Sequence, residues 1–375
     1  MSPRRFLYAS HAYSTHDERF IRAASEDGWE VFHLRFDGTS DERRGETLGF
    51  SEIEWLGTRQ PYSEEAEGAF VDALTEVCRR LRPLFITGGP LHTIGAVIAE
   101  SVAAPYLAMS LASDVLFEAQ HCRRSALNVQ RALSFASGVI VDCETVKAAC
   151  IEHGAEKHQI TVVPWGVDLD AFPYASSQNT ASGLNFLSLR NHEAIYDLKT
   201  LIYGFGLALT SEWLPPESKL VIAGSGTLTG ELKSLAESTG MDGKITFRGQ
   251  VPESDLSVLL RGCDLHVSTS LIDGTSVSLL QAMATGRPSI VADIPSNREW
   301  VNAKCGWRFE AGSAVSLAEA FRDSAASRAR HDWMGVEARA ICEERADWSR
   351  NYVTISRLYD SFFNPSRSID SLKGS

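Results

Sequence analysis

The stretch STSLIDGTSVSLLQAMATGRPSIVAD, Ser268–Asp293, contains the pattern on which the fold prediction rests. An apolar run, Leu265–Thr269, ends in the polar turn Ser270–Thr275. A helix of about three turns is expected next, since apolar residues recur there at helical spacing. The second apolar run, Ser289–Ala292, is a buried strand by the same criteria. Strand, turn, helix and strand in this order predict a parallel sheet.

The turn of this stretch is a candidate binding site. Asp273 is predicted to cap the helix, and Gly274, Thr275 and Ser276 then supply backbone N–H groups at the positive helix end. Gln281 follows Gly274 by two turns and is predicted to lie on the same face. A carboxylate, free amides and a carboxamide suit an anionic, hydroxyl-rich ligand. The alternative is that Asp273 is only a cap and Gln281 only a solvated helix residue.

The same alternation of apolar and amphipathic runs extends over most of the chain. The first half is predicted to hold six strands: Arg5–Ala9, Glu30–Arg35, Leu84–Thr87, Tyr106–Ser110, Gly138–Asp142 and Thr161–Pro164. The second half is predicted to hold Asn185–Leu189, Leu220–Ala223, Ile245–Arg248, Leu265–Thr269, Ser289–Ala292 and Trp307–Glu310. Fully apolar strands that alternate with helices predict parallel sheets covered on both faces.

Two doubly wound domains in tandem account for this pattern. The first is expected at 1–170 and the second at 184–347, because the small polar segment Pro173–Gly183 reads as a linker. A last helix, 348–363, is rich in large apolar residues and is expected to pack back on the first domain. Parallel sheets bind ligands beyond the carboxyl ends of their strands. In the first domain, contacts are therefore expected from three loops: Ser10–His16, Gly88–His92 and Leu111–Asp114.

Composition excludes several function classes. The 375 residues carry a formal net charge of −12, which lacks the basic excess of a nucleic-acid binder. The seven cysteines form no CxxC pair, so neither a zinc knuckle nor a redox dithiol is indicated. No apolar run approaches the ~18 residues of a membrane span, and the start, MSPRRFLYAS, reads as a strand rather than a signal peptide. A cytoplasmic location without an integral membrane segment is predicted.

Three further features could contact an anion. The glycine turn Gly224–Ser225–Gly226 follows a strand and would allow close approach of a phosphate, although many such turns need glycine only for their dihedral angles. Arg190 follows the first strand of the second domain and would fork onto a pyrophosphate, the alternative being a surface salt bridge. Lys199 is either a phosphate-binding cation or a solvated helix residue.

Together these residues resemble a known family. The segments VVPWGVDLDAF (Val162–Phe172) and DGTSVSLLQAMATGRPSIVADIPSNREW (Asp273–Trp300) are similar to retaining glycosyltransferases of family 4, also called glycosyl transferases group 1. The resemblance implies the GT-B fold, an α/β fold of two Rossmann-like doubly wound domains that face each other across a cleft. It also implies transfer of a sugar from a UDP- or GDP-linked donor to an acceptor, without a metal or a cofactor.

The resemblance assigns roles position by position. Asp114, Arg190 and Asp273 match residues at the reaction centre, with Arg190 as the phosphate-binding arginine. Asp273 and Gln281 stand at the two acidic positions of the family motif. The donor contacts implied by the resemblance are Gly224, Ser225, Gly226, Arg248, Val251, Gly274, Thr275, Ser276 and Gln281, with Lys199 as a substitute cation.

Four departures from the family pattern leave alternatives open. Tyr196 stands in place of a phosphate-binding lysine, Leu111 in place of a histidine, and Asp273 and Gln281 in place of two glutamates. One reading is an active transferase that acts on a glycan, a lipid-linked or a small-molecule acceptor. The other is a catalytically silent GT-B protein that serves as a nucleotide-binding or scaffold partner of another transferase. An epimerase or phosphorylase ranks lower. The acceptor, any peripheral membrane contact and the oligomeric state stay open.

Overall fold

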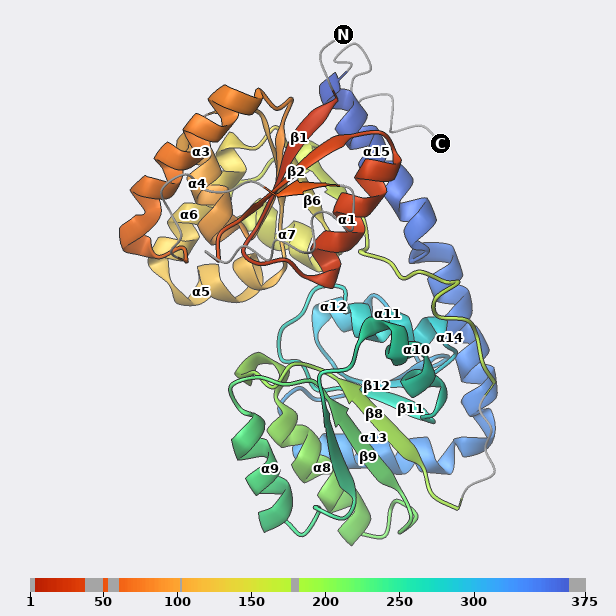
Figure 1. The fold of residues 1–375 in the computed structure, drawn as a ribbon. Helices are drawn as coiled ribbons and strands as arrows, with labels where there is room; N and C mark the ends of the chain where they lie inside the picture. Colours follow the sequence, from red (N-terminus) through yellow and green to blue (C-terminus); the bar gives the residue numbers. More distant parts are fainter. Residues whose placement is uncertain (1–3, 38–49, 53–60, 102, 177–181, 364–375) are drawn as a thin grey trace. The chain divides into compact units, whose positions relative to one another are not determined.

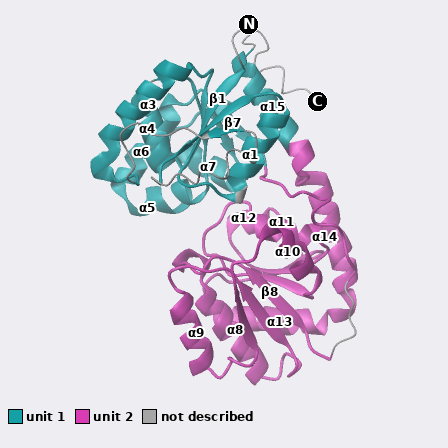
Figure 2. Cartoon of the chain, in the orientation of Figure 1, with its two compact units in different colours: residues 1–163, 352–375 teal, residues 164–351 magenta. Residues whose placement is uncertain are grey.

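The computed structural model describes residues 4–37, 50–52, 61–101, 103–176 and 182–363. It divides into two compact units (Figure 2), unit 1 with residues 1–163 and 352–375 and unit 2 with residues 164–351. The middle of the predicted linker, 177–181, and the tail from residue 364 lie outside the described residues.

Unit 1 contains a parallel sheet of seven described strands. Their order is β3-β2-β1-β4-β5-β6-β7, so the chain leaves β1 in one direction and returns on its other side at β4. The bounds are β1 Arg5–Ser10, β2 Glu30–Arg35, β3 Ser51–Glu52, β4 Ile86–Gly88, β5 Tyr106–Met109, β6 Gly138–Val141 and β7 Ile160–Val162. All six predicted strands are confirmed, and the two-residue β3 is an addition that its few residues could not signal.

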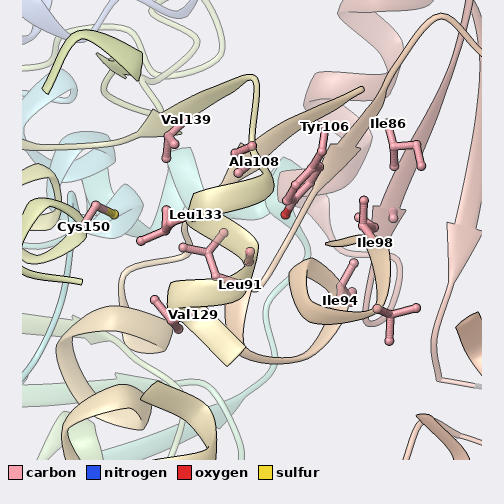
Figure 3. Packing of buried hydrophobic residues seen from close by; sticks show 14 of the residues in the cluster. Ile86, Leu91, Ile94, Ile98, Tyr106, Ala108, Val129, Leu133, Val139 and Cys150 are labelled. Atoms are coloured by element: carbon pink, nitrogen blue, oxygen red, sulfur yellow. The ribbon is translucent and has the colours of Figure 1, made fainter. Parts of the chain in front are cut away.

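Helices cover both faces of this sheet (Figure 1). The face with Leu7 and Ala9 packs against α3, α4, α6 and α7, and the face with Phe6 and Tyr8 packs against α1 and α15. Figure 3 shows part of the first core, where Leu91 and Ile94 lie beneath Tyr106 and Ala108. The bounds are α1 Thr15–Glu26, α3 Glu67–Leu81, α4 Ala96–Ser101, α5 Ala119–His121, α6 Arg123–Phe135, α7 Glu144–Glu152 and α15 Trp348–Phe363, with single π turns η2 Leu91–Gly95 and η3 Asp114–Glu118.

The last helix, α15, buries its aromatic side chains in unit 1. The Tyr359 ring lies 5.0 Å from the ring of Phe6 and 5.3 Å from that of Phe85, measured between centroids. Arg4 forms an ion pair with Asp360 on the same helix. Burial of rings of this size contributes roughly 2 kcal/mol each. Residues 352–363 are therefore an integral layer of unit 1.

Unit 2 contains a parallel sheet of six strands. The order is β10-β9-β8-β11-β12-β13, with bounds β8 Asn185–Leu189, β9 Lys219–Ala223, β10 Ile245–Gly249, β11 Leu265–Ser268, β12 Ser289–Ala292 and β13 Gly306–Phe309. All six predicted strands are confirmed. The helices are α8 Leu198–Thr210, α9 Thr229–Ser238, α10 Glu253–Arg261, α11 Val277–Ala284, α12 Pro295–Arg298, α13 Ala314–Ala326 and α14 His331–Arg345.

Helix α14 was not expected from the sequence. It packs on α11, and its buried residues Met334, Ala338 and Cys342 recur at intervals of four. This spacing is the signal of one helical face. The close approach depends on Gly335, because a Cβ there would lie 2.2 Å from the carbonyl oxygen of Gly286.

The two units divide at Val163, whereas the sequence placed residues up to 170 in the first domain. Backbone pairing explains the difference. The Val167 N–H donates to the carbonyl oxygen of Ala346 (2.8 Å), and the Trp348 N–H donates to that of Val167 (3.1 Å). Segment 164–167 is thereby fixed to the end of α14 in unit 2.

Candidate functional site

The candidate site of unit 2 lies where its strand order reverses. Strand β8 has β9 on one side and β11 on the other, so the loops after β8 and β11 begin at neighbouring strand ends. Crevices that bind ligands in open α/β sheets form at such points. Arg190 follows β8, and Asp273 lies in the loop after β11. Residues 83 positions apart in sequence are thus brought together.

Arg190 is held by hydrogen bonds from both sides of its guanidinium. Nε donates to Oγ of Ser268 (3.2 Å), and Nη2 donates to Oγ of Ser276 (2.6 Å) and to the carboxylate of Asp273. The side chain is only 9% exposed. Its guanidinium carbon lies 5.1 Å from the centre of the Tyr196 ring, a favourable cation–π distance. The aromatic residue at the expected lysine position therefore supports the arginine.

The prediction that Asp273 caps the helix is wrong. Helix α11 begins at Val277, and its N-cap is Ser276, whose hydroxyl accepts from the Leu279 N–H (3.3 Å). Gly274 and Thr275 precede the helix and are buried. Asp273 instead forms an ion pair with Arg190. Burial raises the pKa of Asp273, and the guanidinium of Arg190 opposes that rise.

Gln281 is not a solvated helix residue. It is 5% exposed, and every residue of α11 except Val277 is buried. A carboxamide in such a place needs partners for its donors and acceptor. The burial of Gln281 therefore excludes the alternative that it is a solvated helix residue. Its helix, α11, begins at the cap residue Ser276, which bonds Arg190.

The glycine turn supports the loop that carries Arg190. Gly224 has a φ of +138°, and a Cβ there would lie 2.2 Å from the carbonyl oxygen of Arg190. A Cβ on Gly226 would lie 2.7 Å from the carbonyl oxygen of His192. The carbonyl oxygen of Ser225 accepts from the His192 N–H (3.0 Å). These glycines are needed for packing, whether or not they also face a ligand.

Two functional candidates after β8 were missed. The His192 ring shares a hydrogen bond at Nδ1 with Oγ1 of Thr229 (2.8 Å), while its buried Nε2 has no hydrogen-bond partner among the described residues. Burial lowers the pKa of His192. Glu193 accepts from the N–H of Thr227 (2.8 Å) and from its hydroxyl (2.5 Å). Both residues follow Arg190 within three positions, and this spacing in the sequence could have marked them as candidates.

Other predicted donor residues lie apart from this cluster. Lys199 forms an ion pair with Glu231 of α9 (2.6 Å), with both side chains about half exposed, which favours the solvated helix lysine. Arg248 is exposed on the edge strand β10, and Val251 is half-buried just beyond it. In the described part of the chain, no hydrogen bond joins Arg248 to Arg190. Arg248 and Val251 nevertheless lie at the carboxyl end of β10, on the same edge of the sheet as Arg190.

Asp114 belongs to unit 1 and is fully enclosed. Its carboxylate accepts from the N–H groups of Leu91 (2.9 Å), Leu111 (3.3 Å) and Val115 (3.1 Å), and from the Ser110 hydroxyl (2.7 Å). Burial raises its pKa, and these donors oppose the rise. With no exposed surface, Asp114 fixes the loops after β4 and β5 relative to each other.

Comparison with known proteins starts from a family model. The model described as "Glycosyl transferases group 1" matches residues 205–345. Residues 205–345 are therefore similar to members of the glycosyl transferases group 1 family. The chain is 29% identical to the putative glycosyltransferase EpsF of Bacillus subtilis over 157 residues, 40% of each chain. It is 34% identical to mannosylfructose-phosphate synthase of Agrobacterium fabrum over 104 residues, 26% of this chain and 22% of the relative. It thus spans less than half the length of these relatives.

Solved structures confirm the fold class. HepE from Anabaena, solved with UDP and glucose, superposes with a TM-score of 0.79 over 96% of this chain and 100% of its own, at 17% identity. Sucrose-phosphate synthase from Thermosynechococcus elongatus gives 0.81 over 96% and 99%, at 16% identity. The chain therefore has the predicted GT-B fold of two doubly wound α/β units.

The segment matched by the group 1 model includes Asp273, Gln281 and the glycine turn, but it begins after Arg190. The structure connects Arg190 to the matched segment, since Arg190 donates hydrogen bonds to Asp273 and Ser276. Among the described residues, no group of three or more His, Cys, Asp or Glu is arranged to hold a metal. No helix in the described ranges is long and apolar enough to cross a bilayer.

Proposed function

We propose that this protein is a retaining glycosyltransferase that moves a sugar from a nucleotide-diphosphate sugar to an acceptor. The observation that carries the proposal is the buried Arg190, fixed by Ser268, Asp273 and Ser276 at the point where the strand order of unit 2 reverses. The match of residues 205–345 to a glycosyltransferase family model supports it.

The proposed role of Arg190 is to stabilise the leaving diphosphate. In a buried site, the hydrogen bonds from a guanidinium to a phosphate are stronger than in water. One guanidinium can also bond two phosphate oxygens at once. The backbone N–H of Gly274 bonds the Asp273 carboxylate and would add a donor at the same place once a phosphate displaces that contact. We propose that these groups meet the phosphate charge without a metal. Because Asp273 already pairs with Arg190, the diphosphate of the nucleotide-sugar must share Arg190 with Asp273 or displace that carboxylate.

We propose that the reaction proceeds by front-side attack, which retains the anomeric configuration. The bond between the anomeric carbon and the donor phosphate oxygen breaks, and the acceptor hydroxyl oxygen bonds to that carbon from the same face. The acceptor proton passes to the leaving phosphate oxygen, so no side-chain nucleophile is required. In this scheme Asp273 positions the sugar and Gln281 the ribose. Gly224–Gly226 and Arg248–Val251 line the diphosphate and the nucleobase.

We propose UDP rather than GDP as the nucleotide. HepE was solved with UDP and with UDP-glucose, and a relative from Escherichia coli, 28% identical over 162 residues and 40% of this chain, is a UDP-Gal transferase. Asp114 takes a positioning role, since its carboxylate holds the amides of Leu91 and Leu111.

The test combines calorimetry with turnover. UDP and GDP are titrated into the protein, and UDP-glucose, UDP-galactose, UDP-N-acetylglucosamine and GDP-mannose are then assayed for hydrolysis and transfer. We expect UDP binding and turnover of one UDP-sugar, with the anomeric configuration of the product retained by NMR. Nucleotide binding without hydrolysis or transfer would favour the silent partner of another transferase. Absence of any nucleotide binding would overturn the proposal.

A further inference from the structure

Side chains connect three neighbouring loops at the carboxyl edge of the unit 2 sheet. Strands β10, β9 and β8 are adjacent in the sheet, so the loops that follow them leave it side by side. The loop after β8 carries Arg190 and then Glu193. The loop after β9 is the glycine turn, which continues into Thr227, and the loop after β10 begins with Gln250.

Glu193 bonds the far end of the glycine turn through both carboxylate oxygens. Its Oε1 accepts from the Thr227 N–H (2.8 Å), and its Oε2 accepts from the Thr227 hydroxyl (2.5 Å). These two bonds lower the pKa of Glu193, so the carboxylate is charged at neutral pH. Hydrogen bonds to a charged acceptor are among the stronger ones in proteins. One side chain from the loop of Arg190 therefore holds the glycine turn at two atoms.

The glycine turn is also bonded from the side of β10. Nε2 of Gln250 donates to Oγ of Ser225 (2.9 Å). The backbone adds one bond in each direction, since the Gly224 N–H donates to the carbonyl oxygen of Gly249 (2.8 Å) and the His192 N–H donates to that of Ser225 (3.0 Å). The turn is thus fixed to the loops on both of its sides.

The composition of the turn makes these bonds necessary. Gly224 and Gly226 have no side chain to restrict their dihedral angles, so the turn has little stiffness of its own. A side chain at Gly226 is excluded, because its Cβ would clash with Oε1 of Glu193. A loop that is ordered before its ligand arrives avoids the free-energy cost of ordering during binding.

We propose that Glu193 is a positioning residue for the nucleotide, which fixes the glycine turn against the loop of Arg190 before the nucleotide binds. The inference rests on the proposed function, because the turn lines the nucleotide site of that reaction. Glu193 precedes the segment 205–345 matched by the family model, and the resemblance assigns it no role.

The experiment compares Glu193→Ala, Glu193→Gln and Thr227→Val with the control Glu237→Ala. Glu237 is an exposed carboxylate near the other end of α9. Calorimetry measures the affinity for UDP, and urea unfolding measures stability. The KM of the donor and kcat are measured with the UDP-sugar that turns over. Hydrogen exchange of residues 224–229 reports how well the turn is ordered in the free protein.

We expect Glu193→Ala to weaken UDP binding and to raise the donor KM about fivefold, because the turn must then be ordered during binding. The value of kcat should stay within about twofold, as expected when ground state and transition state lose the same interaction. Glu193→Gln should bind UDP within about twofold of the unmodified protein, since its amide oxygen can still accept from the Thr227 N–H. Glu237→Ala should not change the affinity for UDP.

A double variant tests whether Glu193 acts through Thr227. Thr227→Val removes the hydroxyl that bonds Glu193 and should weaken UDP binding about twofold by itself. In the presence of Glu193→Ala it should have no further effect, because both changes break one interaction. Residues 224–229 should exchange faster in free Glu193→Ala than in the unmodified protein, and equally slowly once UDP is bound.

Three results would overturn the inference: an unchanged UDP affinity in Glu193→Ala, an equal loss in Glu237→Ala, or additive losses in the double variant. A lower midpoint of urea unfolding with unchanged UDP affinity would assign Glu193 to stability alone. Absence of UDP binding by the unmodified protein would overturn the proposed function as well. Equal UDP binding by the unmodified protein and Glu193→Ala would overturn this inference only.

Discussion

The two units share one architecture but differ in the chemistry of their carboxyl edges. Each is a parallel sheet whose strand order reverses beside its first strand, and each places glycine-containing loops there. In unit 2 the edge holds a buried arginine surrounded by hydroxyl and carboxylate oxygens. In unit 1 the loops after β1 and β4 carry His11 and His92, and the enclosed Asp114 follows β5. The fold thus provides two equivalent positions, and the residues after the strands give each one a different charge and hydrogen-bonding character.

The largest expected effect concerns the glycines that both edges have in common. Gly88→Ala and Gly224→Ala should each lower the free energy of unfolding by more than about 3 kcal/mol. Both φ angles lie near +140°, and each new Cβ would overlap a carbonyl oxygen at 1.8 and 2.2 Å. Urea unfolding measures the loss.

Matched controls are Gly68→Ala in α3 and Gly230→Ala in α9. Neither glycine has a neighbour within 4 Å of its Cβ position or a positive φ. They should stabilise slightly, by up to about 1 kcal/mol. If Gly88→Ala is destabilising and Gly224→Ala is not, the common plan of the two edges is wrong.

A second prediction concerns one buried histidine in each unit. Burial lowers the pKa of His33 in β2 and of His266 in β11 to about 3. The unfolded chain takes up a proton below about pH 6.5, while the folded chain does not, so stability is lost as pH falls from 6.5 towards 3. Each residue should cost about 2 kcal/mol at pH 5 relative to pH 7.

Phenylalanine substitutions separate the two histidines. His33 bonds Ser10 through Nε2 (2.9 Å), whereas neither ring nitrogen of His266 has a hydrogen-bond partner in the described ranges of the chain. His266→Phe should remove acid sensitivity at little cost at pH 7. His33→Phe should remove it and also cost about 1 kcal/mol at pH 7. Urea unfolding at pH 7 and pH 5 tests this, and equal behaviour of both variants at pH 7 would refute the distinction.

The comparison also shows what could be predicted from the sequence. Apolar runs located every strand of unit 2, and Arg190 and Asp273 were identified because motif residues follow strands directly. What the sequence could not supply were contacts made across the sheet. Asp273 was assigned to capping because local spacing does not reveal an arginine 83 residues earlier. Tyr196 was counted as a missing cation, although its ring lies over Arg190.

Unit 1 was harder to interpret for the same reason. Leu111 was noted as a lost histidine, but the amides of Leu91 and Leu111 donate to one Asp114 carboxylate. Only the tertiary structure brings these two loops together.

A third, smaller effect is expected from Gln281→Glu. If Gln281 faces the ribose, a charged acceptor should strengthen UDP binding by about tenfold, because hydrogen bonds to ionised groups are stronger. Calorimetry with UDP measures the change. An unchanged affinity in a folded variant would remove Gln281 from the donor site and leave it a buried residue of α11.

The smallest effect is expected from Lys199→Gln. The pair with Glu231 is about half exposed, so its loss should leave the midpoint of urea unfolding nearly unchanged. The affinity for UDP should stay within twofold of that of the unmodified protein. A tenfold loss of UDP affinity would mean that Lys199 replaces the missing cation, and that unit 2 uses two.

The central claim is that unit 2 binds the nucleotide diphosphate through Arg190. Calorimetric titration of UDP into the unmodified protein, Arg190→Gln and Arg261→Gln tests it most directly, since Arg261 is an exposed arginine of the same unit at the end of α10. We predict at least a tenfold loss of affinity in Arg190→Gln and none in Arg261→Gln. UDP binding in folded Arg190→Gln as tight as in the unmodified protein would contradict the account.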